Sequence, residues 1–260
     1  MRSAGAGHAV FAATMIAVGV MGLISGDFAP ILQPVPKGMP AREALVYFCA
    51  VLAMAAGICL FLRRAAAPAA GVLLGLLLVW LLLFRVPVVF RAPADAVSWE
   101  SCAETLVIAA GAWVLYARLA AESGGWRIGL ATGERGVHIA RTLFGLALIP
   151  FGVAHFAYVK ETAALVPAWL PAHVGFAYFT GLAYIAAGVA IVIGIYPRLA
   201  AALSALQMAV LTLLVWIPTV IAGPSAFQWS ETVISWTLTA SAWVVADSFR
   251  ETRWLAVGKR

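Results

Sequence analysis

Charged side chains are scarce in this chain of 260 residues. Asp, Glu, Lys and Arg together make up 11% of it, and the apolar residue types make up 64%. An average soluble domain is about a quarter charged. The composition therefore excludes a soluble enzyme, a nucleic-acid binder and a disordered protein. A mean hydropathy of +0.99 indicates that lipid is the main solvent of the chain.

Cysteine and histidine are also scarce, with three and four residues respectively. The cysteines form no C-x-x-C pair, and Cys49 and Cys59 lie about 15 Å apart along one expected helix, too far for a disulfide. This spacing disfavours a membrane thiol oxidoreductase. A haem held by His155 and His173 is disfavoured, and no metal site is expected. No phosphate-binding glycine loop, Ser-His-Asp set or carboxylate cluster is visible, so the sequence identifies no catalytic residue.

Long apolar segments account for most of the chain. Each is close to the length of about 17–25 residues that a membrane-spanning helix requires. The sequence therefore predicts an all-α membrane protein with eight transmembrane helices, and strands are excluded because apolar and polar residues do not alternate. The expected spans are Ala9–Ile24, Ala44–Leu62, Ala69–Phe90, Trp99–Leu119, Ile139–Val159, Val174–Ile195, Leu199–Ile221 and Thr232–Ala246.

An internal repeat divides these spans into two sets. Residues 35–57 and 166–188 match without gaps at an offset of 131, with nine identities in 23 positions that include prolines of the same loop. We interpret the match as a duplication. It predicts two parallel four-helix repeats, residues 1–119 and 138–260, joined by a linker at 120–137. Four spans are an even number, so both repeats enter the membrane in the same direction.

The basic residues are distributed unevenly between the two sides of the expected bundle. Twelve of the 17 lie on the side of the two termini and five lie on the other. Because cytoplasmic loops are enriched in Lys and Arg, both termini are expected to be cytoplasmic. The basic residues are mostly Arg, and together with the abundant Ala and Gly this favours a high-GC bacterial genome. We therefore expect a bacterial inner-membrane protein.

The fifth span carries the most structured polar pattern. Arg141, Gly145, Gly152 and His155 fall within about 80° of arc on a helix. Glycines on one stripe favour close packing of helices in lipid. A histidine within a membrane usually faces a cavity or a partner, but His155 is also close enough to the interface to be wetted. Both interpretations of His155 remain open.

The loop after this span is polar and aromatic. It contains Tyr158, Trp169 and His173, and its Pro-x-x-x-Pro spacing predicts a stiff segment. Together with the corresponding loop of the first repeat, it could cap an intramembrane pocket. Alternatively, these side chains are interfacial anchors, with Trp169 in the aromatic belt.

Few other polar residues lie within the expected spans. Glu104 is the most costly to bury, and Arg85 on the same side of the membrane is its expected partner. The two residues predict either a structural ion pair between the third and fourth helices or a site that carries protons or binds a headgroup. Glu231 opens the eighth span, and Gln207 lies near the middle of the seventh.

The second half of the chain resembles a known family. The segments "ARTLFGLALIPFGVAHFAY" and "GLAYIAAGVAIVIGIYPRLAA" are similar to the DoxX-like family of four-helix bacterial membrane proteins. The matching features include Arg141, Gly145, Gly152 and Gly188. Many members carry an acidic residue where this chain has Tyr184. The first half resembles the family only through its similarity to the second half.

Two functions follow from the resemblance and from the polar residues. The first is an accessory subunit of a quinone-linked or sulfur redox membrane system, which binds a hydrophobic small molecule and works with a redox partner protein. The alternative is a non-enzymatic carrier or scaffold for a lipid or small molecule, with a pocket between the two repeats. A quinone is the candidate cofactor, and whether the chain is an enzyme stays open. The candidate ligand-binding residues are His155, Tyr158, Trp169, His173, Tyr178, Tyr184 and Gln207, and the charged candidates are Arg85, Glu104, Arg141 and Glu231.

Overall fold

The computed structural model describes residues 5–29, 32–123, 129–223 and 225–258. Within these ranges the chain is helical, has no β-strand and has one isolated β-bridge between Ile195 and Val257. In chain order the elements are α1 (Ala6–Ser25), α2 (Arg42–Leu60), α3 (Ala66–Trp80), η1 (Leu81–Arg85), α4 (Val86–Arg91), α5 (Ala96–Ser123), η2 (Gly129–Ala131), α6 (Gly133–Ala157), α7 (Val159–Ala164), α8 (His173–Ile193), α9 (Pro197–Leu211), η3 (Thr212–Trp216), α10 (Ile217–Ala222) and α11 (Ala226–Ser248). The expectation of an all-α membrane protein is confirmed.

The number of spans differs from the expected eight. Among the described residues seven helices are long and apolar enough to cross a membrane, counting α3–η1–α4 and α9–η3–α10 as one helix each. The 23-residue α11 is not among them, so the count of eight is not confirmed. Hydroxyl side chains lower the hydropathy of α11. They are buried against other helices and donate to carbonyls four residues earlier, as Thr237 does to Val233 and Ser241 to Thr237.

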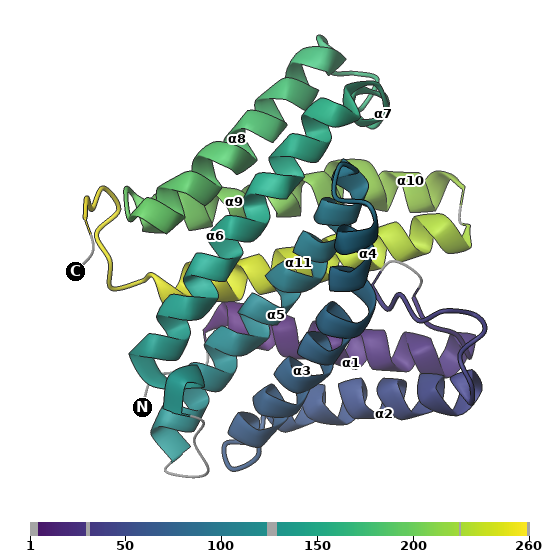
Figure 1. Cartoon of the computed structure of the whole chain (residues 1–260), viewed down its shortest axis with the longest axis vertical. Helices are drawn as coiled ribbons and strands as arrows, with labels where there is room; N and C mark the ends of the chain where they lie inside the picture. The colour runs from purple at the N-terminus through teal and green to yellow at the C-terminus, as the bar shows by residue number, and fades with distance from the viewer. Residues whose placement is uncertain (1–4, 30–31, 124–128, 224, 259–260) are drawn as a thin grey trace.

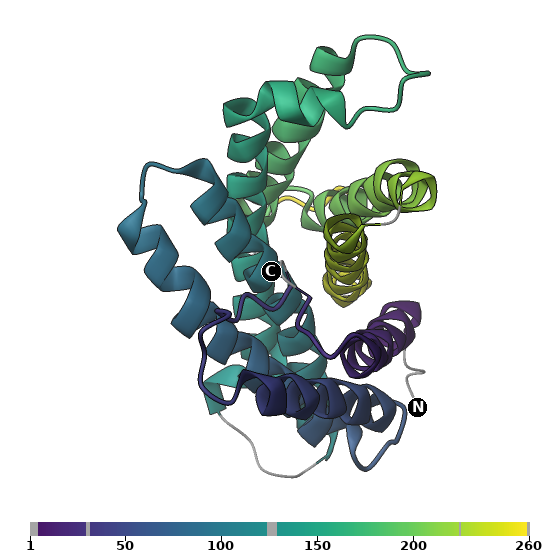
Figure 2. The ribbon, with the colours of Figure 1, turned by 90° about the vertical axis from the view of Figure 1, so that its right-hand side faces the viewer.

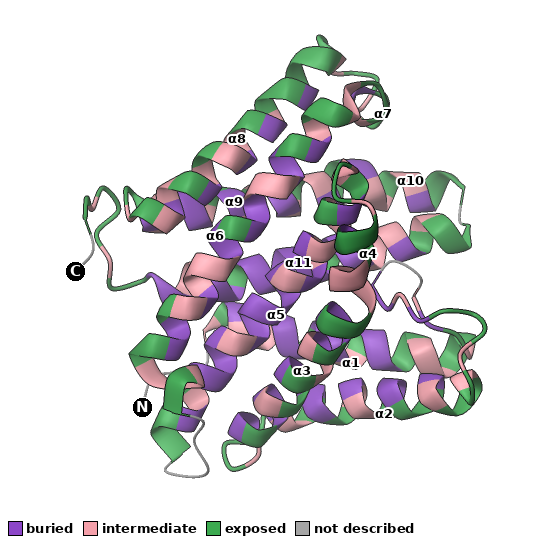
Figure 3. Ribbon diagram, in the orientation of Figure 1, coloured by how far each residue is buried: buried purple, intermediate pink, exposed green. Residues whose placement is uncertain are grey.

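The helices form two groups around a shared central pair (Figures 1 and 2). The pair is α5 and α11, which pack against each other and carry long series of buried residues (Figure 3). On one side α1, α2 and α3 pack in sequence between α11 and α5, and on the other side α6, α8 and α9 pack in sequence between α5 and α11. We call the end where α1 begins and α11 ends the terminal end, and the opposite one the loop end.

Glycines allow a close approach of the backbones in two helix pairs, α6 with α8 and α1 with α2. A Cβ added to Gly152 of α6 would lie 2.4 Å from the carbonyl oxygen of Gly181 in α8, and one added to Gly188 would lie 2.5 Å from that of Gly145. A Cβ on Gly19 of α1 would lie 2.5 Å from the carbonyl oxygen of Ala50 in α2. Small residues of this kind allow backbones to approach each other in lipid. The predicted packing face of the fifth span is thus observed along α6.

Two local distortions recur at an offset of 131 residues. The π-helical segments η1 and η3 begin at Leu81 and Thr212, and each precedes a proline at the second position of the following helix. Proline has no N–H for the carbonyl four residues earlier, so the helix widens before it. Ala41 and Ala172 have φ of 52° and 55° and precede α2 and α8. These pairs of positions are those that a duplication would make equivalent.

Helical residues lie at both ends of the linker predicted at 120–137. The helix α5 continues to Ser123, and α6 begins at Gly133, ahead of the expected start at Ile139. Residues 124–128, which include the Gly-Gly-Trp of the predicted linker, lie outside the described residues.

Candidate functional site

Three of the predicted site residues meet where α6, α8 and α9 pack together. The imidazole of His155 and the phenol of Tyr184 have ring centroids 5.6 Å apart at an interplanar angle of 65°, an edge-on arrangement. The Phe151 ring also packs on Tyr184, with ring centroids 5.6 Å apart at an interplanar angle of 36°. The side chain of Gln207, on α9, hydrogen-bonds to Tyr184. Tyr184 is buried, whereas His155 is half-buried.

The glycine contacts between α6 and α8 position this pair of rings. Gly152 lies three residues before His155, and Gly181 lies three residues before Tyr184, so each glycine is about one turn from a ring. A Cβ on Gly181 would lie 2.9 Å from the Cβ of His155. Any larger residue there would push the histidine away from α8. The close approach of the two helices is therefore a condition for the His155–Tyr184 contact.

Hydrogen bonds fix the orientation of His155 and Gln207. The Nδ1 atom of His155 is 2.7 Å from the carbonyl oxygen of Phe151. A carbonyl only accepts, so Nδ1 carries the proton, and Nε2 of the neutral ring is the acceptor. Nε2 of Gln207 donates to the carbonyl oxygen of Thr180 at 3.1 Å. The pair thus offers a ring nitrogen that can take up a proton next to an oriented phenol.

A group of charged side chains lies beside the ring pair. Glu100 and Glu104 are one turn apart on α5 and interact electrostatically with each other and with Glu231 of α11. Glu104 also interacts with Arg85 of η1, and Glu100 interacts with Tyr184. Carboxyl groups within a membrane are costly as free anions, and proton relays are built from such groups. Sequence reasoning missed Glu100, although its i, i+4 spacing from Glu104 was a usable signal.

Tyr158, a candidate ligand-binding residue, hydrogen-bonds to another part of the chain. Its hydroxyl donates to Oδ1 of Asp95 at 2.8 Å, which joins the end of α6 to the start of α5. The backbone N–H and hydroxyl of Ser98 donate to Oδ2 of Asp95 at 3.1 and 2.8 Å. These bonds, first from Ser98 and then from Tyr158, lower the pKa of Asp95, and the carboxylate raises the pKa of Tyr158. Tyr158 closes the seam between α5 and α6 at the loop end.

Three predicted residues do not join this cluster. Trp169 is 71% exposed in the segment between α7 and α8. Tyr178 is exposed and packs on Phe156, with ring centroids 5.8 Å apart. His173 begins α8, about 16 Å along the helix axis from Tyr184. The sequence placed these residues in the loop after the fifth span or in the sixth span, but it did not specify their neighbours.

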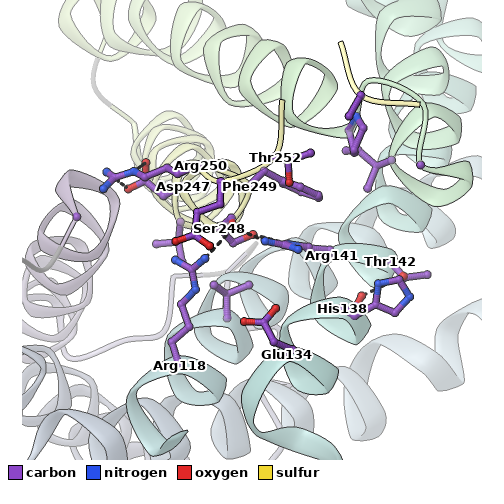
Figure 4. A pocket seen from close by; sticks show the side chains of 18 of the residues that line it. Arg118, Glu134, His138, Arg141, Thr142, Asp247, Ser248, Phe249, Arg250 and Thr252 are labelled. Atoms are coloured by element: carbon purple, nitrogen blue, oxygen red, sulfur yellow. Dashed lines mark hydrogen bonds and ion pairs between the residues drawn. The ribbon is translucent and has the colours of Figure 1, made fainter. Parts of the chain in front are cut away.

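Arg141 lies at the terminal end, far from the ring pair along α6. Its Nε donates to the hydroxyl of Ser248 at 2.8 Å, and its Nη2 donates to the Ser248 carbonyl oxygen. Nη2 of Arg118, from α5, donates to the same carbonyl at 2.7 Å, and the Phe249 ring lies 4.1 Å from the Arg141 guanidinium (Figure 4). The last carbonyls of a helix have no partner within it and attract cations. Arg141 therefore caps the end of α11.

A polar cavity of about 1060 Å³ surrounds this cap at the terminal end. Figure 4 shows Glu134 and His138 of α6 and Asp247 and Arg250 near the end of α11 around it. Three of the arginines that line it are bonded to the chain: Arg118 and Arg141 bond to Ser248, and Arg250 pairs with Asp247 at 3.0 Å. Among the described residues no group of His, Cys, Asp or Glu is arranged to hold a metal ion. We take the His155–Tyr184 ring pair, with Gln207 and the neighbouring glutamates, as the candidate functional site because it brings together three of the predicted site residues.

Comparison with known proteins gives one match. The DoxX family model matches residues 136–216, which run from α6 through η3 and contain His155, Tyr184 and Gln207. No curated protein and no solved structure matches the chain. The resemblance predicted from the sequence is thus confirmed over this part. The chain is a multi-pass membrane protein, and residues 136–216 of it are similar to the DoxX family.

Proposed function

We propose that the chain is an accessory subunit of a quinone-linked or sulfur redox membrane system and that it binds a quinone at the His155–Tyr184 pair. The observation that carries the proposal is the convergence of an imidazole, a phenol and an amide on three apolar helices. Beside them lie three glutamates, Glu100 and Glu104 on α5 and Glu231 on α11. A few polar side chains that converge in apolar surroundings are typical of ligand-binding sites.

The residues at the site fit a ring with oxygen substituents. Phe151 and Tyr184 provide aromatic surfaces against which a flat ring can pack. The Tyr184 hydroxyl can donate to a ring oxygen, and Nε2 of His155 can accept a proton from a ring hydroxyl. A bound quinone would supply the redox chemistry, and a partner protein would supply or remove electrons.

The three glutamates on α5 and α11 give the site access to protons. Glu100 interacts electrostatically with Tyr184 and with Glu231, so these carboxyl groups are placed to exchange protons with the phenol. Arg85 lies near Glu104 at a π-helical segment, a distortion often found at functional sites. We propose that these residues exchange protons with the ligand through Tyr184 and His155.

The proposal also concerns the origin and orientation of the chain. We propose that residues 1–119 and 138–260 are duplicated units and that the terminal end faces the cytoplasm of a bacterial inner membrane. The paired π-helical segments and the paired positive φ of Ala41 and Ala172, both at an offset of 131, support the duplication. The twelve basic residues on the side of the termini support the orientation.

A ligand inventory tests the proposed function. The protein is purified in mild detergent, its organic extract is examined by mass spectrometry, and its visible and ultraviolet spectrum is recorded with and without reductant. We expect a quinone in the wild type and a loss of at least tenfold in His155→Ala and in Tyr184→Phe. His173→Ala is the matched control, because His173 lies outside the ring pair, and it should retain the ligand.

Two results would contradict the proposal. One is a quinone content that His155→Ala and Tyr184→Phe leave unchanged. The other is an extract that contains lipid but no redox-active ring in a protein that is folded and spectroscopically silent. The second result would favour the alternative of a non-enzymatic lipid carrier.

A further inference from the structure

An apolar groove of about 460 Å³ lies at the loop end between α1 and α11. Its floor is formed by buried residues, among them Val18, Phe28 and Ser230. Its rim is formed by exposed residues, among them Ile24 and Trp229. The volume is within the range of about 300–1,000 Å³ that ligand pockets have. The groove is separate from the ring pair on α6 and α8.

The corresponding seam on the other side of the molecule is closed. There α6 meets α5, and the Tyr158 hydroxyl donates to Asp95, which also accepts from the backbone N–H of Ser98 at the start of α5. In the proposed duplication, with the offset of 130 that aligns Gly22 with Gly152, Phe28 occupies the position of Tyr158 and Ser225 that of Asp95.

Ser225 does cap α11 in the way that Asp95 caps α5. Its hydroxyl accepts from the backbone N–H of Gln228 at 3.2 Å, three residues later. Phe28, however, has no hydroxyl with which to bond the cap residue of α11. The seam between α1 and α11 therefore has no counterpart of the Tyr158–Asp95 hydrogen bond that joins α6 to α5. The groove lies at the corresponding position, at the loop end of α1 and α11.

The mouth of the groove carries a pair of opposite charges. Asp27 lines the groove and pairs with Arg42 at 2.6 Å, and the Arg42 guanidinium lies 5.2 Å from the centroid of the Phe28 ring. The bond to Arg42, with a smaller contribution from the charge of Lys37, lowers the pKa of Asp27. The Asp27 side chain is 56% exposed and that of Arg42 is 22% exposed, so both charges are within reach of a headgroup.

We propose that this groove binds one acyl chain of a zwitterionic phospholipid, with the headgroup over Asp27 and Arg42. The apolar floor fits the acyl chain, the carboxylate fits an ammonium group, and the guanidinium fits a phosphate. An anionic lipid without an ammonium group would offer the Asp27 carboxylate no partner in its headgroup. The acyl chain fills the groove between α1 and α11 at the loop end, and it does so independently of the proposed quinone site.

Native mass spectrometry of the full chain tests this proposal. The protein is incubated in detergent with equal amounts of palmitoyl-oleoyl phosphatidylethanolamine and palmitoyl-oleoyl phosphatidylglycerol. We expect the wild type to retain one phosphatidylethanolamine in preference to phosphatidylglycerol. Ala226→Trp, which fills the groove from its exposed edge, should reduce this retention at least fivefold. Ala186→Trp, at an exposed position of α8 outside the groove, is the matched control and should retain the lipid.

A separate substitution, at Asp27, tests the proposed contact with the lipid headgroup. Asp27→Asn should abolish the preference for phosphatidylethanolamine while a lipid is still retained. The proposal would be overturned if Ala226→Trp retained as much lipid as the wild type, or if Ala186→Trp lost as much as Ala226→Trp. It would also be overturned if the wild type preferred phosphatidylglycerol or if Asp27→Asn left the preference unchanged.

Discussion

Replacing Gly152 by alanine should loosen the contact on which the candidate site depends. The added Cβ would lie 2.4 Å from the carbonyl oxygen of Gly181 and 2.4 Å from Cγ1 of Ile185, whereas ordinary contacts are 3.4–4 Å. The carbonyl is backbone and cannot rotate away, so α6 and α8 must separate by about 1 Å. Overpacking of this kind costs about 1–3 kcal/mol. Alanine's better helix propensity offsets up to about 1 kcal/mol of that cost.

We therefore expect the Gly152→Ala variant to be destabilised by about 2 kcal/mol. This corresponds to a Tm lower by about 4–8 °C for a chain of this size. The separation also moves His155 away from Tyr184, whose rings are 5.6 Å apart, so ligand content should fall together with stability. Both are measured on detergent-purified protein, by the thermal loss of helical circular dichroism and by mass spectrometry of the extract.

Gly75→Ala is the matched control for this substitution. Gly75 lies in α3, and a Cβ there would meet nothing within 4 Å. We expect this variant to be as stable as the wild type, or more stable by up to about 1 kcal/mol. A Gly152→Ala variant that unfolds at the wild-type temperature and keeps its ligand would refute the argument that the glycine contact positions the site.

Three further variants test other parts of the structure. The Tyr158–Asp95 bond lowers the pKa of Asp95 and raises that of Tyr158. Its stabilisation should therefore be present from about pH 4 to about pH 10, and it should be lost as the pH falls through the lowered pKa of Asp95 or rises through the raised pKa of Tyr158. The Tm difference between wild type and Tyr158→Phe should vanish at low pH, and a difference that persists there would show that the bond to Asp95 is not its cause. Arg141→Ala removes the bonds to Ser248 and should cost about 2 kcal/mol in unfolding free energy, whereas a Tm equal to that of the wild type would show that the cap contributes nothing. Thr212→Val removes the buried hydroxyl that bonds Ser235 at 2.7 Å, and it should lower stability by about 1 kcal/mol in the same assay; an unchanged midpoint would argue against that contact between η3 and α11.

Much of the fold could be predicted from the sequence because lipid restricts the choice of structure. Apolar segments of spanning length, with backbone groups that must be satisfied internally, leave helices as the solution. The prolines in register indicated the repeat, and the structure adds that Pro87 and Pro218 each follow a π-helical segment. The polar α11 was harder to classify, because its hydroxyl groups are satisfied by its own carbonyls and by Thr212 of a neighbouring helix.

The candidate site was predicted only in part. Periodicity on α6 identified His155 and the glycines of its face, because a stripe on one helix is a local property of the sequence. The contact with Tyr184 depends on which helix packs against α6, and the sequence alone does not specify that neighbour. The same holds for Arg141, whose partner Ser248 lies 107 residues away in the chain. Glu100 was missed although its spacing from Glu104 is local.

Photolabelling gives the most direct test of the account's central claim, that a ring-bearing hydrophobic ligand binds at His155 and Tyr184. The purified chain is irradiated with an azido-quinone, with and without excess unmodified quinone, and the labelled peptides are sequenced by mass spectrometry. The account predicts competable labels in α6 near Phe151 and His155 and in α8 near Tyr184. Labels confined to the groove between α1 and α11, or labels that excess quinone does not reduce, would contradict it.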